Sequence, residues 1–198
     1  MKKLISIFIF LIMSSTYAYS NQFYVGLDIA QISVDTGVTN ISSTLDEDDT
    51  LMKFTGGYNV DENVSIEAFY LDFGEASLSG VSGNRFSYGG STYQFNQTAT
   101  IYLTADTMGI GGKYNFYRSE DKKTGIYLLG GLHSWDVVIG AATGTASANA
   151  TATGTDPYYG FGANYAISES VKANISYQNY EMDSDSIDGF VLGLEYGF

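Results

Sequence analysis

Hydrophobic residues alternate strictly with small or polar ones in the last ten residues of the chain. Phe, Leu, Leu, Tyr and Phe occupy one set of alternate positions between residues 189 and 198, and Gly, Val, Gly, Glu and Gly occupy the other. Because successive side chains of a strand point to opposite faces, this pattern predicts an amphipathic β-strand. A wall that faces lipid and encloses a polar lumen explains a large apolar face backed by glycine and carboxylate, whereas a soluble core does not.

The same alternation recurs along the rest of the chain. It predicts strands at residues 22–34, 50–60, 64–74, 105–117 and 125–138, a sixth that begins near 156, a seventh after the turn at 168–170, and the eighth at 189–198. The facing of 125–138 stays ambiguous, because apolar residues occupy both of its faces. The connections after the second, fourth and sixth strands are short and the others are long or polar, as in outer-membrane barrels.

These features together predict an all-β protein, an eight-stranded antiparallel transmembrane up-and-down β-barrel. A soluble eight-stranded barrel with an apolar lumen is the alternative. Residues 61–63 are expected to form a three-residue hairpin turn with Asn63 in the left-handed conformation. Such a turn sets Tyr58 opposite Ile66, so that both strands keep their apolar faces on one side.

Residues 1–20 have the pattern of a secretory signal peptide. Two lysines precede a short apolar run, and small residues allow cleavage after Ala18 or Ser20. The run is shorter than the roughly 20 residues that a spanning helix needs. We therefore expect an exported chain whose mature part, residues 21–198, is one barrel domain in the bacterial outer membrane.

Composition excludes several classes of function. Without the two lysines of the signal peptide, 7 basic residues face 22 acidic ones, a formal net charge of −15. Nucleic-acid binding needs clusters of Lys and Arg, so we expect no nucleic-acid partner. The chain has no cysteine, which excludes disulfides and thiolate metal sites. Its 23 glycines, 17 tyrosines and single proline suit a continuous sheet.

Five segments carry further motifs, at residues 65–74, 111–114, 131–136, 154–162 and 193–198. In this order they resemble the OmpA-like family of small outer-membrane barrels, which includes OmpX-type proteins. The resemblance implies a protein that consists of the barrel alone, without the family's separate peptidoglycan-binding domain.

The resemblance also implies insertion by the outer-membrane barrel assembly machinery, which reads a terminal aromatic signal. The matching residues in this chain are Gly193, Tyr196 and Phe198.

Polar residues are expected on the lumen face. Members of the family have a charged gate there, and the resemblance places Glu67 and Lys113 at two of its positions. The positions of its other acid and base match Asn164 and Asn174, which are neutral, so an ion pair that plugs the lumen is expected in preference to a gated pore. The whole expected lumen network comprises Asp28, Lys53, Glu67, Lys113, Asn164, Asn174 and Glu195.

The loops offer three candidate features. Carboxylates cluster at 46–49 and 181–188; oxygen ligands suit Ca²⁺ or Mg²⁺, but no glycine-spaced Ca²⁺ loop is present, so a solvated acidic face and no metal site are expected. Aromatic residues flank 89–92 within the loop at 75–104 and predict a projecting hairpin, whose rings either bind a partner or pack the two arms together. The segment 141–155 is low in complexity and is expected to be a mobile loop.

His133 is the only histidine, and Ser134 follows it directly. Adjacent residues of a strand point to opposite faces, so the two act together as base and nucleophile only if a bulge intervenes. Another serine or carboxylate that approaches His133 in space is the alternative. A histidine near the outer interface beside Trp135 is expected instead. With no metal-ligand spacing and no phosphate-binding loop, we expect no cofactor and no enzymatic activity.

The expected function is that of an integral outer-membrane protein with a structural and surface-interaction, adhesion-like role through acidic extracellular loops. Its expected partners are outer-membrane lipid, lipopolysaccharide and a surface partner. The alternatives are a small passive pore, which the filled interior of an eight-stranded barrel disfavours, and an outer-membrane enzyme that modifies lipid A.

Overall fold

The computed structural model describes residues 22–33, 37–39, 42–46, 48–183 and 185–198. The expected signal peptide lies outside these residues and stays a prediction. The described part contains no helix long and apolar enough to cross a membrane. Its strands are β1 (Phe23–Ser33), β2 (Thr44–Asp46), β3 (Asp48–Asn59), β4 (Val64–Gly80), β5 (Arg85–Tyr88), β6 (Ser91–Gln94), β7 (Ala99–Arg118), β8 (Thr124–Thr143), β9 (Ser147–Ala166), β10 (Val171–Met182) and β11 (Asp185–Gly197).

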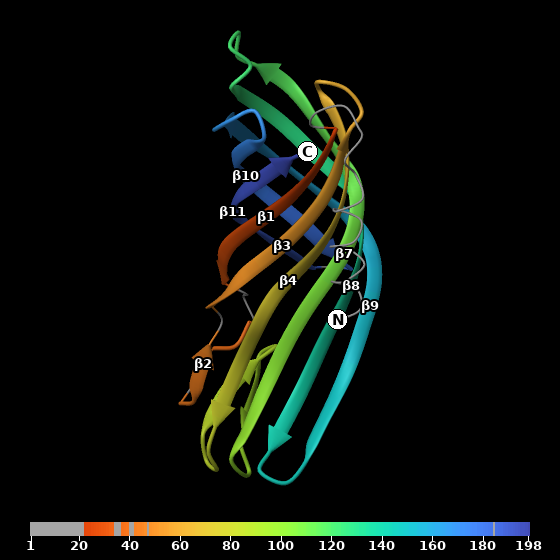
Figure 1. Ribbon diagram of the computed structural model, residues 1–198. Helices are drawn as coiled ribbons and strands as arrows, with labels where there is room; N and C mark the ends of the chain where they lie inside the picture. The colour runs from red at the N-terminus through yellow and green to blue at the C-terminus, as the bar shows by residue number, and fades with distance from the viewer. Residues whose placement is uncertain (1–21, 34–36, 40–41, 47, 184) are drawn as a thin grey trace.

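Eight of these strands close into an antiparallel barrel. In the order β1, β3, β4, β7, β8, β9, β10 and β11, each strand pairs with the next, and β11 pairs back to β1. The strands tilt around a common axis and give the tall, twisted wall of Figure 1. The prediction of an eight-stranded up-and-down barrel is confirmed.

Three short strands lie outside the barrel wall. β2 pairs with residues 77–79 of β4, and β5 and β6 form the hairpin that the aromatic pattern predicts. Within the hairpin the rings of Phe86 and Tyr93 stack at 5.4 Å between centroids, and Phe95 lies 5.4 Å from Phe86. The rings therefore pack the hairpin together, which is one of the two roles considered for them.

The two faces of the wall differ as the alternation predicts. On β11, Phe190, Leu192 and Leu194 point outward and are 55–68% exposed, whereas Val191 between them is 2% exposed in the lumen. The facing of β8 is now clear, because Tyr127, Leu129 and Trp135 are buried inside, whereas the other apolar set (Ile126, Leu128 and Leu132) faces out.

Glycines on the lumen side make room for large rings. A Cβ at Gly109 would lie 2.5 Å from the ring of Phe69, and a Cβ at Gly57 would lie 2.1 Å from the ring of Tyr24. Since real atoms cannot approach so closely, each ring requires glycine on the neighbouring strand. This explains why the polar faces of the strands are rich in glycine.

The expected turn at 61–63 has the predicted register but a different conformation. Tyr58 lies opposite Ile66, as predicted. Asn63 is not left-handed, so that prediction is wrong. The Asp61 carboxylate closes the turn instead by accepting the N–H groups of Asn63 (2.7 Å) and Val64 (2.8 Å), which lowers the pKa of Asp61.

The segment 141–155 is not a loop, and the prediction of a mobile loop there is wrong. β8 and β9 pair along it without a gap, from Trp135 opposite Gly154 to Ala142 opposite Ser147, and only residues 144–146 form the turn. Aromatic rings cover glycines here as well, because the ring of Trp135 lies over Gly154. The small residues of the segment alternate between two faces and extend the sheet.

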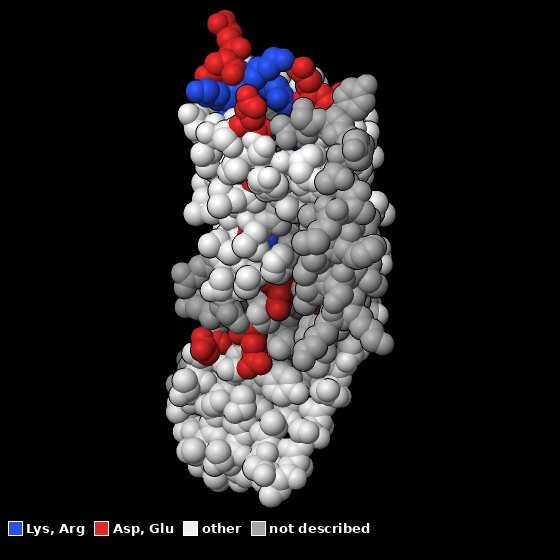
Figure 2. Space-filling view, viewed as in Figure 1, with Lys and Arg blue, Asp and Glu red and all other residues white. Residues whose placement is uncertain are grey.

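The two ends of the barrel differ in shape and charge. The short turns 60–63, 119–123 and 167–170 lie at one end, which the general rule for outer-membrane barrels assigns to the periplasm. Figure 2 shows mixed basic and acidic residues at that end. Toward the other end Asp72, Asp106 and Asp136 lie side by side across β4, β7 and β8 and face outward. They mark where the belt of apolar, outward-facing side chains (the apolar belt) ends. On the face that Figure 2 shows, the tip beyond them is uncharged.

Candidate functional site

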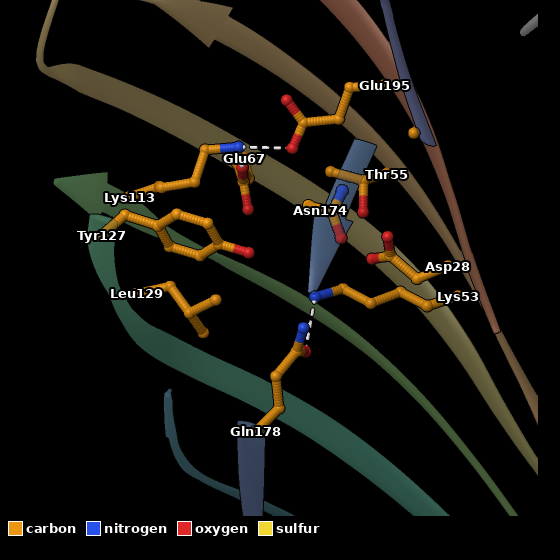
Figure 3. Close-up of a pocket in the computed structure, with 11 residues that line it drawn as sticks. Asp28, Lys53, Thr55, Glu67, Lys113, Tyr127, Leu129, Asn174, Gln178 and Glu195 are labelled. Atoms are coloured by element: carbon orange, nitrogen blue, oxygen red, sulfur yellow. Dashed lines mark hydrogen bonds and ion pairs between the residues drawn. The ribbon is translucent and has the colours of Figure 1, made fainter. Parts of the chain in front are cut away.

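The lumen is closed by a lysine shared between two carboxylates. Lys113 Nζ on β7 lies 2.8 Å from Glu67 Oε1 on β4 and 2.6 Å from Glu195 Oε1 on β11. The hydroxyl of Tyr24 donates to Glu67, and the Lys113 ammonium also lies 4.8 Å from the centre of the Tyr24 ring. All three charged side chains are at most 12% exposed, so these ion pairs are buried in the lumen. Because the three residues come from β4, β7 and β11, the contacts link three strands across the interior (Figure 3).

A second lysine lies deeper in the lumen. Lys53 Nζ donates to Gln178 Oε1 at 3.0 Å and lies 4.6 Å from the centre of the Phe69 ring. Asp28 reaches toward the same space (Figure 3). The cavity between the two lysines measures about 10 Å³, which is room for about one water molecule.

Six of the seven expected lumen residues line this cavity. They are Asp28, Lys53, Glu67, Lys113, Asn174 and Glu195. The seventh, Asn164, lies opposite Asn174 across β9 and β10, and its amide donates to Asn115 Oδ1 at 3.0 Å. Asn164 therefore belongs to a separate contact beside the Lys113 cluster.

Sequence reasoning missed several lumen residues. Tyr24, Thr55, Tyr127 and Gln178 also take part in the network or line its cavity. Their inward position follows from the alternation of the strands. They were missed because the predicted network was built from charged and amide residues that match the family's gate or lie on the polar faces, and three of the four carry no charge or amide.

Aromatic side chains fill the lumen beyond Lys53. Tyr158 and Tyr180 stack at 5.6 Å between centroids, and Phe69 lies edge-on to Tyr158 at 4.9 Å. Phe73 packs against Tyr180 in the same way at 5.5 Å. This layer and the lysine cluster both lie in the described part of the lumen, and the cavity beside the lysines has room for about one water molecule.

His133 faces the lumen and not the lipid. It is 1% exposed; its Nδ1 lies 2.8 Å from Thr107 Oγ1 and its Nε2 lies 2.8 Å from the backbone oxygen of Glu181. Ser134 lies on the opposite, exposed face, as the alternation predicts. Trp135 also points inward and donates from Nε1 to Asp156 Oδ2 at 2.7 Å. Among the described residues no three acidic or histidine side chains group as metal ligands.

The carboxyl-terminal residues close the barrel. The Phe198 ring lies 6.4 Å from the rings of both Phe23 and Tyr196. A Cβ at Gly193 would lie 1.7 Å from Asp28 Oδ1, so a larger residue there would force the Asp28 carboxylate to move. Gly193 thus has a packing role besides its predicted part in the assembly signal.

The predicted acidic loops are only partly loops. Asp46 lies in β2, and Glu181, Asp185 and Asp188 lie within β10 and β11, so of the residues described there only Asp183 is in a turn. Glu47, from the first acidic run, lies outside the described residues. Asp183 has a left-handed backbone (φ 56°), and its N–H donates to Asp156 Oδ2 at 2.9 Å.

Comparisons with known proteins agree with this architecture. The family described as "outer membrane protein beta-barrel domain" matches residues 4–198. No curated protein sequence matches the chain.

Three solved structures show the same fold at low sequence identity. Neisserial surface protein A is 13% identical with a TM-score of 0.57, and the attachment invasion locus protein Ail of Yersinia pestis is 12% identical with a TM-score of 0.55. The β-barrel domain of Pseudomonas aeruginosa OprF is 12% identical with a TM-score of 0.54. Each likeness covers 91% of this chain and 100% of the other. The chain belongs to the outer-membrane β-barrel family and is an integral protein of the Gram-negative outer membrane.

Proposed function

We propose that this protein acts at the cell surface as a structural and surface-interaction protein with an adhesion-like role. The observation that carries the proposal is the sheet that extends past the apolar belt at the outer end. β8 continues seven residues beyond Asp136, to Thr143, and β9 returns from Ser147. At about 3.4 Å per residue and a tilt near 45°, this places the tip roughly 15–20 Å beyond the belt.

The lumen supports this role better than conduction. The ion-paired Lys113 and the aromatic layer around Tyr158 fill the interior, and the cavity between them holds about one water. A passive pore would need these side chains to move apart together.

The proposal includes no enzymatic activity. Both ring nitrogens of His133 are hydrogen-bonded within the lumen, to Thr107 and to the backbone of Glu181. A histidine held in this way is a packing residue, and the Thr107 hydroxyl beside it also donates to the backbone oxygen of Ser134.

The proposed partners follow from position and charge. The apolar belt faces outer-membrane lipid. We propose that the carboxylates at its outer edge, such as Asp106, lie at the level of the lipopolysaccharide headgroups. We propose that the exposed acidic residues Asp183, Asp185 and Asp188 act in surface contacts as well. Ail is described as an attachment invasion locus protein and was solved with a heparin analogue, and the likeness to its fold makes a surface role a natural first test.

The test is a loop deletion scored for adhesion. Residues 139–150 are replaced by Asn-Gly, which keeps Val138 opposite Thr151 and supplies a two-residue turn. A matched variant replaces residues 85–94, the β5–β6 hairpin, by Gly-Ser. Cells that express each form are compared for binding to cultured epithelial cells and to fibronectin, collagen and bare plastic. Heat-dependent gel mobility reports whether each barrel is folded.

We expect the first deletion to abolish binding that the intact protein confers, while its gel mobility still shifts on boiling. If cells with the intact protein bind no better than cells without it, the proposed function is wrong.

A further inference from the structure

Asp28 and Lys53 are cross-strand neighbours in the lumen that do not pair with each other. They lie opposite each other on β1 and β3 and are 7% and 2% exposed, yet no ion pair within 4 Å among the described residues includes them. The Lys53 ammonium donates instead to Gln178 Oε1 at 3.0 Å and lies 4.6 Å from the centre of the Phe69 ring. Figure 3 shows the Lys53 side chain passing the Asp28 carboxylate on its way to Gln178.

The Asp28 carboxylate is buried without a partner. None of the described residues donates a hydrogen bond to it, although it points into the cavity beside Lys53 (Figure 3). Its neighbours in the chain, Leu27 and Ile29, face outward in the apolar belt, so bulk water does not reach it from that side. An ionised carboxylate in such a place is costly, and the group is neutralised by a proton instead.

An amide oxygen lies close to the same carboxylate. A Cβ at Gly193 would lie 1.7 Å from Asp28 Oδ1 and 2.7 Å from Asn174 Oδ1, so both oxygens occupy the space above this glycine. Carboxylate and amide oxygens are both acceptors, so they do not attract each other. A proton on Asp28 makes it a donor and allows a hydrogen bond from its O–H to the amide oxygen.

The other charged groups around Asp28 have partners of their own. Lys113 lies 2.8 Å from Glu67 and 2.6 Å from Glu195, so its charge is shared by those two carboxylates. Lys172 lies opposite Glu195, at the periplasmic end of β10. The cavity is thus lined by three carboxylates and two ammonium groups. One further positive charge makes this group of side chains neutral.

Two tyrosines also face Asp28, Tyr127 from β8 and Tyr180 from β10. The Tyr127 hydroxyl has its hydrogen-bond partner on β10, and the Tyr180 hydroxyl donates to Gln178 Oε1 at 2.5 Å. Gln178 therefore accepts from Tyr180 as well as from Lys53, and it keeps a donor when the lysine moves away.

We propose that the cavity at Asp28 is a proton-binding site in which a proton and Lys53 compete for one carboxylate. With the proton bound, the Asp28 O–H donates to Asn174 Oδ1 and Lys53 stays with Gln178. When the proton leaves to the solvent, the Lys53 ammonium turns to the Asp28 carboxylate and supplies the positive charge. Lys53 then also leaves the Phe69 ring, so loss of the proton removes a contact of the aromatic layer. This site goes beyond the proposed surface role and does not depend on it.

Two other arrangements leave Asp28 ionised. In one, a water molecule in the cavity, which has room for about one, donates to the carboxylate. In the other, the Asn174 amide is rotated by half a turn and its nitrogen donates. Neither places a proton on Asp28, so a direct measurement of the carboxyl proton separates both from the proposal.

The experiment is infrared spectroscopy of the full mature chain in lipid nanodiscs between pH 4 and pH 9. The carbonyl stretch of a protonated carboxyl lies apart from the bands of carboxylates and backbone amides. The parent is compared with Asp28→Asn, whose amide has the shape of a protonated carboxyl and also donates to Asn174. Asp121→Asn, on an exposed turn, is the matched control.

At pH 6 the parent should show a carbonyl band of at least about a third of one carboxyl per chain that Asp28→Asn lacks, whereas an exposed aspartate is protonated in roughly one molecule in a hundred. Asp121→Asn should keep the band. Asp28→Asn should also keep its heat-dependent gel mobility, because it retains the donor. A smaller difference, an Asp28→Asn chain that does not fold, or a band that only Glu195→Gln removes would overturn the proposal.

Further variants test the competition with Lys53. In Lys53→Met the ionised carboxylate loses its cation, so the proton concentration at which the band is half lost should fall at least tenfold. Lys123→Met, on an exposed turn, should leave that concentration within twofold. Gln178→Leu removes the acceptor that holds the lysine away from Asp28 and should raise it at least threefold. An unchanged value in Lys53→Met, or a fall in Gln178→Leu, would overturn the proposal.

Discussion

Removing the shared lysine of the lumen should destabilise the barrel strongly. In Lys113→Met, the carboxylates of Glu67 and Glu195 lose their only cation within 4 Å among the described residues. Loss of one partner from a buried ion pair typically costs about 3–5 kcal/mol, because the remaining charge is left uncompensated. With a urea slope of about 2 kcal/mol per molar, the unfolding midpoint should fall by about 1.5–2.5 M.

A set of matched variants tests the cause of this effect. Lys123→Met makes the same substitution on an exposed turn and should change the free energy of unfolding by less than about 0.5 kcal/mol. The triple variant Lys113→Met, Glu67→Gln, Glu195→Gln removes all three charges and should recover most of the loss. Unfolding is followed by the boiled-minus-unboiled gel shift or by fluorescence of Trp135, the only tryptophan. A triple variant as unstable as the single one would refute uncompensated charge as the cause.

Three further predictions concern packing, the buried histidine and a turn. Gly109→Ala should cost about 1–3 kcal/mol by overpacking, because its Cβ meets a phenylalanine ring at 2.5 Å, whereas Gly112→Ala, with its nearest atom at 3.6 Å, should cost far less in the same urea titration. Thr107→Val should cost about 1–3 kcal/mol, because it leaves the Nδ1 of His133 without its partner, and a serine at this position should recover the loss. The pKa of Asp61 is lowered by two backbone N–H groups, so its contribution to stability is complete above the unfolded pKa of about 3.9 and is lost as the pH falls through the lower folded value. Its alanine variant should therefore show a smaller loss of stability than the parent when unfolding is compared at pH 6 and pH 2; an identical loss would contradict this role.

The sequence was most informative where one face of a strand is apolar and the other is not. The terminal strand has this contrast, and its facing was predictable from it. The Tyr58–Ile66 register was predictable from a short turn at 61–63 between two strands that each have one apolar face. On β8 the contrast fails, because Leu129 beside the lysine cavity and Trp135 farther along the strand are buried in the lumen and are as apolar as the lipid face.

Two features depended on contacts that the sequence does not display. The outer extension of β8 and β9 is built from small residues, whose pairing depends on neighbouring strands and on rings such as Trp135 over Gly154. The hydrogen bond between Asn164 and Asn115 joins strands β9 and β7, which are not neighbours in the sheet. Only the closed barrel brings such side chains together across the lumen.

The most direct test of the account is single-cysteine labelling, because the chain has no cysteine of its own. The three positions are Thr151 on the extension, Ile110 on the apolar belt and Lys122 on a short turn. In intact cells a membrane-impermeant maleimide should label Thr151→Cys at once, and Lys122→Cys only after the outer membrane is permeabilised. Ile110→Cys should resist this reagent, and a fluorophore attached there before insertion should be quenched by brominated lipid. Labelling of Lys122→Cys but not Thr151→Cys in intact cells would reverse the orientation, and ready aqueous labelling at Ile110→Cys would contradict a lipid-facing barrel wall.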